Sequence, residues 1–315
     1  MLDALTFTDS DLVQLSKDNF ISLKIDAESD YGLELFNQFN GTGYPLIIFL
    51  DKKGKEVDRF YGYIPAYEFI IKMNNVLSGQ NTFLDYLDKY EKGNHSAEVL
   101  KPLADKYKDK GDSKQALAIY KDLIKSANVS KEDFDHATYH IASLALIIDK
   151  KVESMYNFLA LFEGSNNFEN GVYDLINYYK VNQMEDDEIE TFTKYLPLLN
   201  QSYNFLNSYA WRMSELELNL EDALIKIDTA LSLIEETHKS YPNILDTKAE
   251  VLWKLGEIDA AIDIIDEALK INPNSEYYKT QKEKFLNYTH QKILKKTILE
   301  LIQRIEIQLN LLSGF

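Results

Sequence analysis

The chain has 315 residues and a formal net charge of −17, with 34 Lys and Arg against 51 Asp and Glu. This acidic balance argues against a nucleic-acid groove, because phosphate binding needs a basic surface. The sequence holds no Cys, which excludes disulfides and Cys-ligated zinc sites. No apolar run approaches the ~20 residues of a membrane span. The length allows two domains, or one domain followed by a repeat array.

The first predicted elements are a strand and a short helix. Apolar residues occupy every second position between Phe20 and Ile25, which is the period of a strand with two unlike faces. The helix follows, with Leu35, Phe36 and Phe39 at helical spacing and an Asn-Gly pair at its end.

A hairpin and a second helix are predicted next. Leu46–Leu50 is an apolar run short enough for a strand that is buried on both faces. The turn residues Asp51–Gly54 separate it from a second strand, Val57–Tyr61. Pro65 then opens a helix whose apolar residues form one stripe. The stripe consists of Phe69, Ile70, Met73, Val76 and Leu77.

This order of elements resembles the carboxyl-terminal half of a thioredoxin-like domain. The resemblance rests on Lys24–Asp26, Gly43–Pro45, Ile47–Asp51, Gly54–Glu56 and Gly62–Tyr63. It implies a cis peptide bond before Pro45 and a peptide-contact surface at Tyr44 and Pro45. The family usually has Thr after this Pro, whereas this chain has Leu46.

The catalytic half of that family has no counterpart in this sequence. Members carry a Trp-Cys-x-x-Cys motif upstream of the resembling segment, and thiol–disulfide exchange requires a thiolate. The chain as given is therefore predicted to be non-catalytic and to need no cofactor, and a cytoplasmic location is expected. The alternative is a truncated thiol–disulfide oxidoreductase, active in cell redox homeostasis, whose motif lies upstream; a periplasmic or secreted location then stays open.

The missing strand would lie between the strands predicted at 20–25 and 46–50. Its absence leaves backbone donors and acceptors unpaired on both sides, at about 1–3 kcal/mol for each buried group. Residues 1–80 are therefore expected to fold poorly by themselves, or to associate.

Residues 81–94 are predicted to be a connecting helix, and 95–275 a series of about five helix pairs. The best pair, 242–275, has small and apolar residues at regular positions: Leu245, Ala249, Leu252, Gly256, Ala261, Ile265, Ala268 and Pro273. This spacing resembles the tetratricopeptide repeat of 34 residues. Two of the units are degenerate. The predicted fold is thus a truncated α/β thioredoxin-like domain (1–80) followed by an all-α solenoid of tetratricopeptide type.

The repeats contain the predicted binding residues. Alignment on the Ala positions puts Asn207 and Trp211 of one unit, and Asp246, Glu250 and Trp253 of the next, on groove-facing positions. Aromatic anchors with polar surroundings are typical of peptide recognition. The acidic pair replaces the Lys and Arg of carboxylate-clamp members of the family, which predicts a neutral or basic peptide. The alternative is that both Trp residues fill gaps between repeats.

Three further features are weaker. His136 and His140 are spaced to share a metal ion, but no third ligand is evident, and no metal site is predicted. The acidic run Glu185–Glu190 is predicted to be a solvated helix start. Residues 276–315 are predicted to cap the array as a helix, with membrane or partner docking as the alternative. Together these features predict a scaffold for protein or peptide clients, without nucleic acid and without a membrane span.

Overall fold

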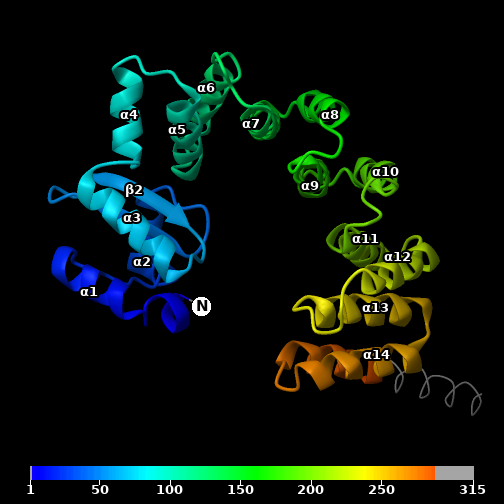
Figure 1. Cartoon of the computed structure of the whole chain (residues 1–315). Helices are drawn as coiled ribbons and strands as arrows, with labels where there is room; N and C mark the ends of the chain where they lie inside the picture. Colours follow the sequence, from blue (N-terminus) through cyan, green and yellow to red (C-terminus); the bar gives the residue numbers. More distant parts are fainter. Residues whose placement is uncertain (1, 288–315) are drawn as a thin grey trace, which may run out of the picture. The chain divides into compact units, whose positions relative to one another are not determined.

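The computed structural model describes residues 2–287, which belong to two compact units, Met1–Tyr178 and Tyr179–Phe315. We refer to them as the first and second units and describe each by itself (Figure 1). No helix between residues 2 and 287 is both long enough and apolar enough to cross a membrane.

The first unit begins with the thioredoxin-like region. Its elements are a π-helix η1 (Leu2–Thr6), α1 (Ser10–Asn19), α2 (Asp30–Gln38), β1 (Leu46–Leu50), β2 (Glu56–Tyr61) and α3 (Ala66–Ser78). The predicted hairpin is confirmed: β1 and β2 pair antiparallel, with Leu46 opposite Tyr61. The helix predicted after Pro65 is also confirmed, and Pro65 is its N-cap residue.

The core of this region lies between the hairpin and the helices α1 and α3. Phe49 of β1, Phe60 of β2 and Phe69 of α3 are buried together with Leu12 and Met73. The Phe60 and Phe69 rings meet edge to face, with centroids 5.2 Å apart. The apolar face of the hairpin is therefore covered by α3, as Figure 1 shows.

The predicted strand at residues 20–25 is wrong. Residues 20–26 have no regular secondary structure, and the sheet consists of β1 and β2 within the described residues. Ile21 and Leu23 are 95% and 80% exposed. A strand needs a neighbouring strand to pair its backbone groups, and within the described residues no strand pairs with residues 20–26. Phe20 alone reaches the core, where its ring lies 5.8 Å from that of Phe49.

A helical region completes the first unit. It comprises α4 (Phe83–Glu91), α5 (Ala97–Asp109), α6 (Ser113–Leu123), α7 (Lys131–Asp149), α8 (Val152–Leu161) and α9 (Phe168–Val181), the last of which continues into the second unit. Ala104 of α5 and Ala116 of α6 are fully buried beside Leu103, Tyr120 and Leu123. These two Ala side chains are small, so the helices of the first pair can approach closely.

Buried ion pairs join the thioredoxin-like region to this first helix pair. Asp58 of β2 accepts hydrogen bonds from the Lys106 ammonium and from the backbone N–H of Phe83. Glu56 pairs with Lys110 at 2.8 Å and with Arg59 at 2.6 Å. Burial opposes ionisation of Glu56, but these two cations outweigh it and lower the pKa of the carboxyl group. The hairpin and α5 are thus held together by charge as well as by packing.

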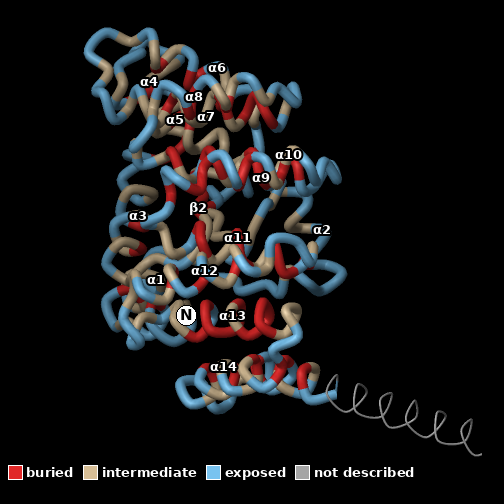
Figure 2. Tube along the Cα trace, turned by 90° about the vertical axis from the view of Figure 1, so that its right-hand side faces the viewer, coloured by how far each residue is buried: buried red, intermediate tan, exposed pale blue. Residues whose placement is uncertain are grey.

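The second unit is entirely helical in its described part. After α9 it contains α10 (Glu185–Tyr195), α11 (Tyr203–Leu216), α12 (Leu220–Ser232), α13 (Tyr241–Leu255), α14 (Ile258–Ile271) and a helix over residues 276–287. Ala249, Ala261, Ile265, Ala268 and Phe285 are fully buried in its core. Figure 2 shows the buried positions that follow one another along α13.

The helices from α5 to α14 follow one another in the chain as five pairs, as expected for the repeats. Gly256 forms the predicted turn within the best pair, with φ of 85° in the left-handed region that favours glycine. The compact units divide at residues 178 and 179, and the predicted family boundaries stay a prediction. Helix 276–287 buries Tyr278 and Phe285 against the last pair, and the rest of the predicted capping helix lies outside the described residues.

Candidate functional site

The loop before β1 contains the feature that the thioredoxin resemblance implied. The Tyr44–Pro45 peptide bond is cis. The Pro45 carbonyl accepts a hydrogen bond from the Gly62 backbone N–H at 2.9 Å, so it is occupied by the end of the hairpin. Tyr44 is 56% exposed and packs on Phe36, with ring centroids 4.7 Å apart. Peptide contact at Tyr44 and Pro45 stays a prediction.

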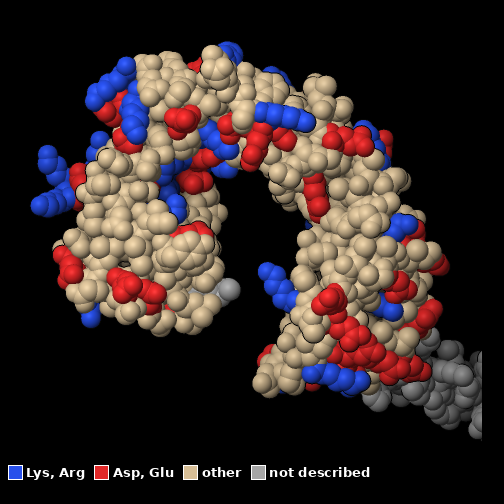
Figure 3. All heavy atoms as spheres, in the orientation of Figure 1, with Lys and Arg blue, Asp and Glu red and all other residues tan. Residues whose placement is uncertain are grey.

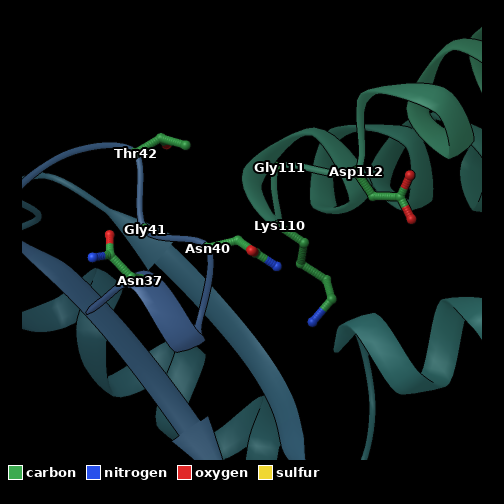
Figure 4. Close-up of a pocket in the computed structure, with 7 residues that line it drawn as sticks. All are labelled: Asn37, Asn40, Gly41, Thr42, Lys110, Gly111 and Asp112. Carbon is green, nitrogen blue, oxygen red and sulfur yellow. The ribbon is translucent and has the colours of Figure 1, made fainter. Parts of the chain in front are cut away.

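An open cavity of about 530 Å³ lies next to this loop, where it faces the turn between α5 and α6 (Figure 4). Its lining is Asn37, Asn40, Gly41, Thr42, Lys110, Gly111 and Asp112. The charged groups in this lining already have structural roles. Lys110 pairs with Glu56, and the Asp112 side chain accepts a hydrogen bond from the backbone N–H of Gln115 as an N-cap. The cavity is therefore polar, but both of its charged side chains already take part in structural contacts.

The predicted groove residues Asp246 and Glu250 are brought together on α13. They are 5% and 6% exposed, because helix 276–287 lies over them. The Tyr277 hydroxyl donates to Asp246 Oδ2 at 3.0 Å, and the Lys284 ammonium pairs with Glu250. Burial, reinforced by the Glu250 charge, raises the pKa of Asp246 to about 6. The other oxygen of this carboxylate, Asp246 Oδ1, is buried and has no well-aligned hydrogen bond among the described residues, although the Gln281 side chain is close enough to act on the carboxylate and oppose the rise of its pKa.

Trp253 completes this cluster. Two ammonium groups lie near its ring, that of Lys254 at 4.7 Å and that of Lys284 at 4.6 Å from the ring centroid. The Phe285 ring is 5.7 Å away. Cations over an indole face are attracted by its quadrupole. The Trp253 ring therefore already has cationic groups as neighbours.

The two remaining predicted groove residues lie on α11, which packs beside α13. The Trp211 indole N–H donates to Glu215 Oε1 at 3.0 Å. The Asn207 side-chain oxygen is buried without a hydrogen-bond partner among the described residues. We use the term inner cluster for Asn207, Trp211, Asp246, Glu250, Trp253, Tyr277 and Lys284.

Sequence reasoning missed Tyr277 and Lys284. A signal for them exists, because Lys284 follows Glu250 by 34 residues, which is one repeat length. Continuing the 34-residue count past residue 275 would have predicted a further helix, with both residues on the face that corresponds to the predicted groove face of α13.

The acidic run at the start of α10 is not uniformly solvated, contrary to prediction. Glu188 is 1% exposed, and both of its oxygens accept hydrogen bonds from the Arg212 guanidinium, at 2.7 and 2.8 Å. This bidentate pair joins α10 to α11 within the second unit.

The first unit contains a cluster that sequence reasoning identified only in part. Asp105 of α5 lies 2.8 Å from His136 Nε2, and its carboxylate accepts a hydrogen bond from the Tyr120 hydroxyl. Burial opposes ionisation of Asp105, but these two contacts outweigh it and lower its pKa. Burial, assisted by the Lys108 charge, lowers the pKa of His140 to about 3, so this imidazole is neutral. Asp105 is a third potential metal ligand beside the two His residues, which the sequence pattern did not reveal.

Comparison with known proteins supports both halves of this description. Residues 3–77 match the thioredoxin-like domain family, and residues 242–275 match the tetratricopeptide repeat family. The chain therefore combines a thioredoxin-like domain with a helical solenoid of tetratricopeptide type. No curated protein matches the sequence.

Several solved structures are similar to the chain, among them those of YrrB, BtubC and MamA. The protein YrrB, described as a TPR protein with an unusual peptide-binding site, is 14% identical over 63% of this chain and 97% of its own, with a TM-score of 0.43. BtubC from P. vanneervenii is 15% identical over 56% of this chain and 79% of its own, with a TM-score of 0.43. MamA is 15% identical over 61% of this chain and 94% of its own, with a TM-score of 0.42.

Proposed function

We propose that this protein is a non-redox scaffold that binds a protein or peptide client through the inner cluster of the second unit. The observation that carries this proposal is the buried Asp246 carboxylate, of which one oxygen has no well-aligned hydrogen bond within residues 2–287. An unsatisfied buried polar group costs about 1–3 kcal/mol, more when it is charged. A donor supplied by a ligand would remove that cost.

The chemistry of the cluster favours a basic ligand side chain. Lys284 places an ammonium against Glu250 and over the Trp253 ring, which supports a cationic group as the ligand. A Lys or Arg of a client would use the same carboxylates and the same indole face, with Lys284 displaced towards solvent. Figure 3 shows acidic side chains gathered over α13 and α14, which would attract such a client.

The test is a binding titration of the full chain against three peptides of equal length that carry Lys, Glu or Ser at alternate positions. The two Trp residues of the chain, Trp211 and Trp253, both belong to the inner cluster, so their fluorescence reports binding directly. We expect the Lys peptide to bind most tightly, and its affinity to fall with added salt.

Substitution separates the site from the fold. Trp211→Ala with Trp253→Ala is expected to abolish binding, followed with a labelled Lys peptide because the intrinsic signal is lost. The matched control is Tyr67→Ala, which removes an aromatic residue that is 64% exposed on α3 in the other unit. Equal affinity for all three peptides, or full binding by a correctly folded double variant, would refute the proposal.

A further inference from the structure

A group of potential metal ligands lies in the first unit, independent of the inner cluster. His136 and His140 are one turn apart on α7, so both rings are on the same face, with centroids 4.5 Å apart. Asp105 reaches them from α5. One donor atom from each of the three residues lies within 4.8 Å of the other two.

Two of the ring nitrogens in this group have charged neighbours. The Lys108 ammonium lies 3.3 Å from His140 Nε2. An ammonium has only donors, so this nitrogen presents its lone pair to the cation. On the other side of the cluster, Asp105 Oδ1 lies against His136 Nε2. The Lys108 ammonium thus occupies the position next to His140 Nε2 that a metal ion would take.

Tyr120 supports two of the three residues. It is fully buried on α6, its hydroxyl donates to Asp105, and its ring stacks on His140 with centroids 5.0 Å apart. Groups that orient ligands in this way accompany most metal sites in proteins. The Asp105 and His136 side chains are 33% and 23% exposed, so an ion has a path from solvent.

We propose that Asp105, His136 and His140 bind a divalent transition-metal ion such as zinc, with water as a fourth ligand. Two imidazoles and one carboxylate are a frequent ligand set for such ions. Tetrahedral zinc holds its donors about 3.4 Å apart, at about 2.1 Å from the metal. The Asp105–His136 contact must open slightly, and the more distant donors must close by about an ångström. Lys108 must leave, which its flexible side chain allows by extending into solvent.

The test uses the full chain prepared without a histidine tag and titrated with Co²⁺, whose visible absorption reports four-coordinate binding. We expect one Co²⁺ for each chain and its displacement by Zn²⁺. His136→Gln and His140→Gln are each expected to abolish the absorption band. His238→Gln, which changes a histidine of the second unit, is the matched control and should leave the band intact.

Lys108→Met is an independent test, because it should strengthen Co²⁺ binding where the His variants abolish it. Removing a competing cation from the site should tighten Co²⁺ binding by roughly tenfold or more, which loss of a merely structural contact would not do. Circular dichroism confirms that each variant is folded. Absence of the band, its persistence in both folded His variants, or an unchanged affinity in Lys108→Met would overturn the proposal.

Discussion

Replacing the buried Asp246 by Asn is expected to stabilise the second unit at neutral pH. The pKa of this carboxyl group rises from 3.8 to about 6 on folding, because burial penalises the charged form. A shift of about two units corresponds to about 3 kcal/mol of differential stability, at about 1.4 kcal/mol per unit. Asp246→Asn keeps the size of the side chain and an acceptor for the Tyr277 hydroxyl, but carries no charge.

The sign of the pH dependence follows from proton binding. Between pH 4 and 6 the folded state binds more protons at Asp246 than the unfolded state does, so this residue lowers the free energy of unfolding as pH rises through that window. The advantage of the Asn variant should therefore be absent below pH 4, grow through the window, and be complete above pH 6 at up to about 3 kcal/mol.

Urea denaturation of the full chain, followed by Trp fluorescence at several pH values, measures this difference. Both Trp residues lie in the second unit, so the signal reports the unfolding of that unit. Asp263→Asn makes the same change at an exposed position of α14 and serves as the control. If Asp246→Asn lowers stability at pH 7, or gives a gain that does not depend on pH, the reasoning from burial is wrong.

Three further predictions concern the Arg212–Glu188 ion pair, the exposed segment before α2 and the absence of Cys. Arg212→Met should lower the free energy of unfolding by about 3–5 kcal/mol, because Glu188 would stay buried and unpaired; chemical denaturation measures this, and a change below about 1 kcal/mol would contradict it. Ile21→Ser and Leu23→Ser should each change stability by no more than about 0.5 kcal/mol, since both side chains are exposed; a larger loss in thermal unfolding would show that the segment is packed after all. The chain should be inactive in an insulin-reduction assay, because it has no Cys to supply a thiolate; turnover by the purified protein would contradict this.

Local patterns were sufficient to predict most of the elements. The hairpin was predictable because a five-residue apolar run, a turn and a second apolar run are adjacent in the sequence. The repeat at 242–275 was predictable because Ala249, Ala261 and Ala268 must be small where helices approach. The segment at 20–25 has an equally regular pattern, yet its structure depends on a partner strand elsewhere in the chain, which no local pattern can supply.

The sites were harder to predict for the same reason. Asp105 is 31 residues before His136 and on another helix, so its place beside the two His residues became visible only in the packing of α5 and α7. Glu188 was hidden in a run of acidic residues of which it is the one that meets Arg212. The residues predicted for the groove were identified by repeat position, which gives the face of a helix but not the helix that covers it.

The ion pairs between the hairpin and α5 have a consequence for how this protein can be divided. Cutting the chain at residue 80 would deprive Lys106 and Lys110 of their carboxylate partners, and would release the Phe83 backbone N–H from Asp58. The first helix pair would then carry two Lys side chains without their ion-pair partners. The thioredoxin-like region and the first helix pair are therefore expected to depend on each other for stability. Replacing either of them by a homologous piece would require matching changes on both surfaces.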